Sequence, residues 1–341
     1  MTTIPITALS RSKGVKLECE ICGKPACLKC SSCPTYYCSR EHFQTDWNGI
    51  LNLIADDINV LRSKPKLIGS EQERHKRKEE LKAIRKEVLE LCVETAHKYL
   101  IQGNFELAVP GALYGLKLAL ELHGNEALEL VPSYLLLAEA NLGLHRLKVA
   151  EEFLSLANWS LLKYPKEKAG HRVMSSLQRN FGRLYAAQRR HQESLRAFAT
   201  DVYHSAREYG PEDVKTAPSY FHMGRVFQSH HKVDQAQAFY DKVLNIYGTW
   251  LATERALKEK ESSGGAPASE SKALASGGSG TLGDVELDEA VEIAGHIVEY
   301  RAKKLGVDSP SAKEAKVIFI GLVDKCRELK AQIDGEMEDM R

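Results

Sequence analysis

From Leu81 onward, apolar residues follow the three- and four-residue spacing of amphipathic helices, and small residues recur within this pattern. The small residues come in pairs twelve positions apart, namely Ala96 with Ala108, Ala138 with Ala150, Gly182 with Ser194, and Gly224 with Ala236. The first members of these pairs are separated by 42, 44 and 42 residues. Because a small side chain lets two helices approach closely, each pair predicts a hairpin of two packed helices.

This spacing resembles the tetratricopeptide repeat, in which the first small residue is followed three positions later by an aromatic residue. The aromatic residue is present as Tyr99, Tyr185 and Phe227 and is absent from the second copy. The period of about 42 residues exceeds the roughly 34 of the plain repeat, so we expect extended second helices. The resemblance implies a mainly α fold, a right-handed α-solenoid with four tetratricopeptide-like hairpins over residues 81–248.

Several residues between these helices indicate where a helix begins or ends. Ser70 and Glu73 have the spacing of a capping box, which begins the first helix within a connector over residues 58–80. Glycine tolerates the left-handed backbone that ends many helices, and we expect this role for Gly124, Gly210 and Gly306.

The C-terminal part of the chain, residues 249–335, predicts a fifth hairpin and a final capping helix. The expected helices lie near 287–305, as the second helix of that hairpin, and near 311–332, as the cap. An insertion over residues 261–283 interrupts the hairpin. Its glycine, serine and alanine cannot bury enough apolar surface to offset the ordering entropy, so we expect a flexible solvent loop.

Six of the eight cysteines lie between Cys19 and Cys38. They form CxxC pairs at Cys19–Cys22 and Cys30–Cys33, and His42 follows Cys38 in the pattern CxxxH. Two such elements supply the tetrahedral ligand set of a structural zinc ion, which can fold a segment too small to hold its own core. In a reducing compartment this clustering favours metal ligation over disulfides. We therefore predict that the segment binds Zn²⁺.

The same segment, residues 15–57, resembles the MYND zinc finger, because Tyr37 precedes the CxxxH element and an Asp46–Trp47 pair follows it. In that family the ligands of two zinc ions interleave. The resemblance implies a first zinc site made of Cys19, Cys22, Cys38 and His42.

The second zinc site departs from the family pattern. Cys30 and Cys33 are present, but the closing His and Cys are replaced by the apolar stretch that contains Ile50, Leu51, Ile54 and Ala55. The site keeps two of its four ligands, with Cys27 as the candidate for a third. We expect apolar packing to hold the last helix of the finger in place of the second metal ion.

Net charge, the length of apolar stretches and missing motifs argue against several classes of function. The 47 basic and 46 acidic residues leave a net charge of +1, so no global field draws the chain to nucleic acid or an anionic membrane. The most apolar stretch, residues 107–116, is far shorter than the roughly 18–20 residues that cross a bilayer, and the polar start of the chain lacks a signal-peptide pattern. The chain also lacks the Asn-His-x-Cys motif of SET methyltransferases, a phosphate loop and an HExxH motif, so we predict that it is not an enzyme.

The stacked first helices of such an array line a concave surface that can hold a partner protein. The repeat positions expected there are His97, Leu135, Glu139, Arg179, Arg183, Phe221 and Arg225. The middle of this groove is basic, which suits an acidic or helical partner segment, although solvated arginines without a role fit the pattern as well.

A MYND finger with histidine in the CxxxH element, a charged connector and long-period hairpins together resemble the zinc finger MYND domain-containing protein 12 family. The resemblance implies a docking or accessory subunit of the single-headed inner dynein arms of motile cilia and flagella, located on the axoneme and in the cytoplasm. It also implies another tetratricopeptide-repeat protein and an inner-arm dynein heavy chain as partners, with the doublet microtubule as a further contact. A nuclear MYND-type adaptor that recruits corepressors is the alternative.

Overall fold

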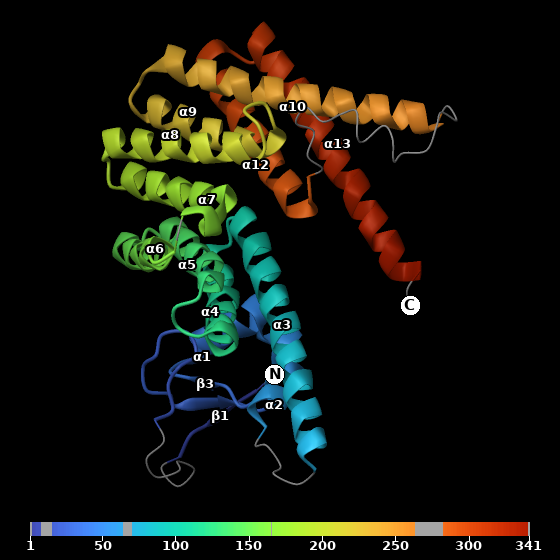
Figure 1. Ribbon diagram of the computed structural model, residues 1–341. Coiled ribbons are helices and arrows are strands. Elements are labelled where there is room, and N and C mark those ends of the chain that lie inside the picture. The colour runs from blue at the N-terminus through green and yellow to red at the C-terminus, as the bar shows by residue number, and fades with distance from the viewer. Residues whose placement is uncertain (1, 8–15, 64–69, 165, 263–281, 340–341) are drawn as a thin grey trace. The chain divides into compact units, whose positions relative to one another are not determined.

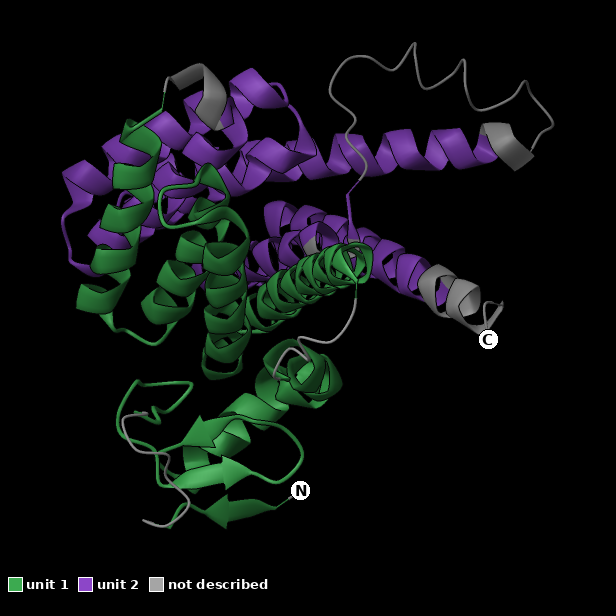
Figure 2. Ribbon diagram, turned by 60° about the horizontal axis from the view of Figure 1, so that its bottom comes forward, with its two compact units in different colours: residues 1–169 green, residues 170–341 purple. Residues whose placement is uncertain are grey.

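The computed structural model describes residues 2–7, 16–63, 70–164, 166–262 and 282–339 (Figure 1). The chain divides into two compact units, residues 1–169 and 170–341 (Figure 2). The fold within each unit is mainly α, as expected from the apolar pattern. Most of the predicted insertion, residues 263–281, lies outside the described residues.

Unit 1 begins with a small finger that combines a three-stranded sheet with short helices. The strands β1 (Thr3–Pro5), β2 (Leu28–Cys30) and β3 (Tyr36–Tyr37) are antiparallel in the order β1-β2-β3. The helical part is continuous from α1 (Arg40–Asp46) through the π-helical turn η2 (Trp47–Leu51) to α2 (Asn52–Arg62).

Two helix pairs complete unit 1. The first pair is α3 (Glu71–Ile101) with α4 (Phe105–His123), and the second, preceded by the 3₁₀ turn η3 (Leu128–Leu130), is α5 (Val131–Gly143) with α6 (Leu147–Leu162). The predicted capping box begins α3, because the Ser70 hydroxyl accepts from the Glu73 N–H at 3.3 Å and the Glu73 carboxylate accepts from the Ser70 N–H at 2.8 Å.

Unit 2 contains three further helix pairs among its described residues. They are α7 (Lys166–Ala187, which enters the unit at Gly170) with α8 (His191–Glu208), α9 (Ala217–Ser229) with α10 (Val233–Ser262), and α12 (Asp284–Leu305) with α13 (Pro310–Asp339); the 3₁₀ turn η4 (Val214–Thr216) precedes α9. Gly124, Gly210 and Gly306 all have positive φ where a helix has ended, as predicted.

The small residues occupy the helix contacts that their spacing predicted. Gly182 and Gly224 face the rings of Phe198 and Tyr240, and the Ser194 hydroxyl donates to the Gly182 carbonyl at 2.8 Å. The alanines of the other pairs are buried. The helix pairs therefore pack in the predicted register.

The C-terminal helix pair differs from expectation. The ring of His296 in α12 lies 5.4 Å from that of Phe221 in α9, and Tyr300 lies 5.3 Å from Tyr240 in α10. Gly295 faces Phe319 of α13, which repeats the glycine–aromatic contact of the earlier pairs. The prediction that 287–305 is a second helix is thus corrected: α12 packs as the first helix of an uninterrupted pair, with α13 as its second. Sequence spacing missed this register because the inserted residues disturb the period.

Replacing Gly224 with alanine is expected to destabilise unit 2 by about 1–3 kcal/mol, because the added Cβ overpacks the contact. This Cβ would lie 2.6 Å from Cε1 of Tyr240, a fully buried ring. Gly248 in α10 provides the control, since its Cβ would lie 3.5 Å from the nearest atom, on Ile318. Gly248→Ala should stabilise the helix by up to about 1 kcal/mol. Denaturant unfolding of both variants checks the opposite signs.

Candidate functional site

Two segments of the finger carry the four predicted metal ligands. Cys19 and Cys22 lie on a tight turn that is closed by a hydrogen bond from the Gly23 N–H to the Cys19 carbonyl at 2.9 Å, and Gly23 has φ 67°. Cys38 and His42 flank the start of α1. The structure therefore brings the Cys19–Cys22 turn next to the N-terminal end of α1, which carries the other two ligands.

The ligand atoms of Cys19, Cys22, Cys38 and His42 all lie within 4.8 Å of one another. The Nδ1 atom of His42 is 3.4 Å from Sγ of Cys19 and 3.3 Å from Sγ of Cys38, and the Sγ atoms of Cys22 and Cys38 are 3.6 Å apart. Tetrahedral zinc requires about 3.8 Å between two sulfur ligands and about 3.6 Å between sulfur and nitrogen. The Cys₃His cluster thus has the size and donor set of a structural metal site.

Electrostatics within the cluster favour a cation. Burial together with the neighbouring thiols of Cys22 and Cys19 raises the pKa of Cys38 to about 11. Thiolates this close repel one another, so the cysteines ionise together only when a positive charge lies between them. The arrangement is that of a site completed by a metal ion.

Cys30 and Cys33 belong to the packed core of the finger. Both are buried, and they lie in one apolar cluster with Ile50, Leu51 and Ile54, the residues at the closing positions of the second zinc site. Apolar contacts thus hold the last helix of the finger here, and the replacement of the second metal ion by them stays a prediction. Among the described residues, Cys19, Cys22, Cys38 and His42 are the one set of three or more Cys, His, Asp or Glu that converges to metal-binding distance.

The structure corrects the suggestion that Cys27 is a third ligand beside Cys30 and Cys33. Cys27 is exposed, and its thiol donates to the Cys38 carbonyl at 2.9 Å. Among the described residues, the thiols of Cys27, Cys30 and Cys33 do not converge to metal-binding distance.

A buried polar cluster that the sequence did not reveal adjoins the metal ligands. Asp46 at the end of α1 is fully buried and accepts from the Tyr37 hydroxyl at 2.5 Å and from the Tyr114 hydroxyl of α4 at 3.5 Å. Its Oδ1 atom has no hydrogen-bond partner within the described structure. Burial, reinforced by the nearby charge of Glu20 and opposed by the Tyr37 hydrogen bond, raises the pKa of Asp46 to about 7.

Asp46 is expected to make unit 1 less stable as pH rises. The unfolded chain loses this proton near pH 3.8, whereas the folded chain keeps it to about pH 7, so the stabilisation is complete below the first value and lost by the second. At about 1.4 kcal/mol per pKa unit, the total change is on the order of 4 kcal/mol.

Urea unfolding of the metal-loaded protein and of Asp46→Asn between about pH 5 and 8 measures this effect, because asparagine does not titrate while metal binding changes with pH in both proteins. The free energy of unfolding of the wild type minus that of the variant should fall as pH rises. A flat or rising difference would show that Asp46 is already ionised in the folded protein.

The predicted groove residues differ in their surroundings. In unit 1, His97 is exposed and Glu139 is half-buried, but Leu135 is only 8% exposed. In unit 2, Phe221 is 5% exposed. The expectation that Leu135 and Phe221 face a partner is therefore corrected, because both pack in the core.

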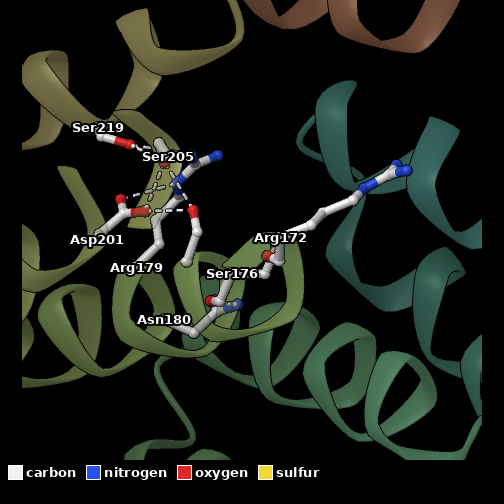
Figure 3. Close-up of polar contacts among 8 residues, drawn as sticks. Arg172, Ser176, Arg179, Asn180, Asp201, Ser205 and Ser219 are labelled. Carbon is white, nitrogen blue, oxygen red and sulfur yellow. Dashed lines mark hydrogen bonds and ion pairs between the residues drawn. The ribbon is translucent and has the colours of Figure 1, made fainter. Parts of the chain in front are cut away.

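Arg179 lies in a buried network instead of pointing freely into a groove. Its guanidinium donates to Asp201 at 3.1 Å and to the Ser219 hydroxyl at 3.1 Å, as Figure 3 shows. Asp201 also accepts from the hydroxyls of Ser175 at 2.5 Å and Ser205 at 3.2 Å. This network joins α7, α8 and α9.

Arg225 is the exposed cation of this surface in unit 2. Its guanidinium carbon lies 5.9 Å from the ring centroid of Phe221, so the buried ring supports it. Burial lowers the pKa of His222 well below its ordinary value, and the charges of Arg183, Arg179 and Arg225 add to this shift. Half-buried Arg183 belongs to the same surface. His296 of α12 also contacts this surface, through the ring of Phe221. Sequence spacing missed it because that spacing places 287–305 as a second helix. The Gly295–Phe319 pair, which repeats the glycine–aromatic contact of the earlier helix pairs, could have identified α12 as a first helix.

Comparison with known proteins agrees with the repeat assignment. The tetratricopeptide repeat family matches residues 173–248, which span α7 to α10. Two solved structures are similar: BtubC (BKLC) from P. vanneervenii, with 16% identity over 75% of this chain and 92% of that chain at a TM-score of 0.42, and PilF of Pseudomonas aeruginosa, with 20% identity over 68% and 98% at 0.34. No helix within the described ranges has the length and apolarity to cross a membrane. Tetratricopeptide repeats indicate a protein-binding scaffold, and the chain is a tetratricopeptide-repeat-containing protein with a Cys₃His cluster at its N-terminus.

Proposed function

We propose that this protein is a non-catalytic adaptor, and that it serves as a docking or accessory subunit of an inner, single-headed dynein arm on the axoneme of motile cilia or flagella. The proposal rests on the order of its parts, a Cys₃His finger followed by tetratricopeptide hairpins, together with the family resemblance. Another tetratricopeptide-repeat protein, an inner-arm dynein heavy chain and the doublet microtubule are the proposed partners. Zn²⁺ is the proposed metal, at one ion per chain.

The observation that supports a partner site is the basic surface at α7 and α9. Arg225 is exposed and held over a buried ring, and the charge of half-buried Arg183 acts on the same helix at His222. A guanidinium in this setting suits a carboxylate, because it offers paired donors with a fixed geometry. We therefore expect an acidic segment of the partner at this surface.

Affinity purification of the full-length protein from ciliated cells, combined with imaging of its location, tests the proposal. Recovery of inner-arm dynein heavy chains with the wild type, and their loss with Arg225→Glu, is the expected result. Lys316→Glu, which reverses an exposed charge on α13, is the matched control and should keep the partners. A nuclear location with chromatin-associated corepressors would instead support the nuclear adaptor, and absence from cilia would refute the axonemal role.

A further inference from the structure

We propose that the finger is the N-terminal cap of the repeat array, and that metal bound by Cys19, Cys22, Cys38 and His42 controls the order of the first hairpin, α3–α4. The inference rests on the proposed metal site. It goes beyond the scaffold function because it makes part of the partner-binding array depend on metal. The observation behind it is that each ligand-bearing segment is tied to the same helix, α4.

The first tie starts between two ligands. Glu20 lies between Cys19 and Cys22, and its side chain is 8% exposed. Its carboxylate accepts from Lys117 of α4 at 2.6 Å and from Arg62 of α2 at 2.6 Å. Two ion pairs therefore hold this buried carboxylate, one of them to the first hairpin.

The second set of contacts with the hairpin comes from residues that follow Cys38 and His42 in the sequence. Asp46 lies four residues after His42 and accepts from Tyr37, next to Cys38, and from Tyr114 of α4. One turn later, Gly49 packs so closely on α4 that an added Cβ would lie 2.8 Å from the Leu107 carbonyl oxygen. The Tyr99 hydroxyl of α3 donates to the Asn48 carbonyl at 2.8 Å.

The apolar core is shared in the same way. One buried cluster contains the finger residues Phe43, Ile50, Leu51, Ile54 and Ile58 together with the hairpin residues Val88, Cys92, Tyr114 and Leu118. A terminal repeat lacks a neighbour on one side, so its apolar face must be covered for the repeat to be stable. Here the finger covers it.

These contacts make a physical coupling. Without metal, no common centre holds the four ligands together, and the small size of the finger favours separation of its two ligand-bearing segments. The Glu20 and Asp46 contacts to α4 then lose their fixed positions, and the hairpin core is exposed. We expect α3–α4 to open more often in the apo protein while unit 2 is unchanged.

Hydrogen–deuterium exchange of the full chain tests the coupling, with metal content measured in parallel. One equivalent of Zn²⁺ added to the apo protein should slow exchange in α3–α4 over residues 88–118 by about tenfold or more, with no change in α9–α10. The variant Tyr114→Phe/Lys117→Met cuts the polar ties between the finger and α4 and leaves the ligands intact. It should still bind one metal ion, read with Co²⁺ by the absorption of a tetrahedral thiolate site, but the slowing of the hairpin should be much reduced.

Arg85→Met is the matched control, because it removes a surface ion pair within the same hairpin, Arg85–Glu121, instead of the ion pair that joins the hairpin to the finger. It should keep the full metal effect. Wild-type protein that binds metal while exchange in α3–α4 stays unchanged would overturn the coupling and leave the metal site standing. Failure of the wild type to bind Zn²⁺ would refute the metal site and the coupling with it.

Discussion

Replacing Cys38 with serine is expected to abolish metal binding and unfold the finger. Cys38 contacts both His42 and Cys22 in the cluster, so its loss removes a central ligand. Structural zinc supplies on the order of 10–16 kcal/mol to small zinc-finger peptides, and a segment of this size keeps little stability without it. Native mass spectrometry should show one zinc ion per wild-type chain and none in Cys38→Ser, and the thermal unfolding of unit 1 should shift to lower temperature in the variant.

Two neighbouring cysteines are the controls for this prediction. Cys27→Ser changes an exposed thiol outside the cluster, and Cys30→Ser tests the pair whose partner ligands are replaced by apolar residues. Both variants should retain one zinc ion. Two zinc ions in the wild type, or loss of zinc in Cys27→Ser, would contradict the single Cys₃His site.

Replacing Asp201 with alanine is expected to destabilise unit 2 by about 3–5 kcal/mol, since it leaves the guanidinium of Arg179 without its buried partner. The Asp201 side chain is completely buried and that of Arg179 is 20% exposed. The hydroxyls of Ser175 and Ser205 lose their acceptor as well. Denaturant unfolding followed by the fluorescence of Trp250, with Trp47 and Trp159 replaced by phenylalanine, measures the loss in this unit.

Glu193→Ala is the matched control, because it removes an exposed ion pair with Arg190 on the same helix, α8. Solvent screens an exposed pair of this kind, so this variant should unfold nearly as the wild type does. If both variants lost the same free energy of unfolding, the buried network would contribute no more to stability than an exposed ion pair does.

The repeat register and the first ligand set were predictable from short-range patterns. A close helix contact requires a small residue opposite a large ring, so Gly182 and Gly224 were identifiable from spacing, and the structure pairs them with Phe198 and Tyr240. Gly295 obeys the same rule, but the residues before α12 disturb the period, and its helix was assigned to the wrong place in the pair.

The packing of the finger against the first hairpin could not be predicted from short-range sequence patterns. Its contacts join residues 68 and 97 positions apart, as in Tyr114–Asp46 and Lys117–Glu20. The local sequence around each of these residues does not indicate its partner. Arg179 illustrates the same limit, because its place in the repeat predicted exposure while Asp201, on the next helix, draws it into a buried pair.

The sequence by itself determined the helical period, the helix ends and the spacing of the metal ligands, because these depend on residues within one hairpin or one short ligand-bearing segment. The tertiary structure alone decided which polar groups are buried and to what they are paired, and hence that the finger and the first hairpin form one core. Desolvation and packing are set by neighbours brought together from distant parts of the chain, and no local pattern encodes them.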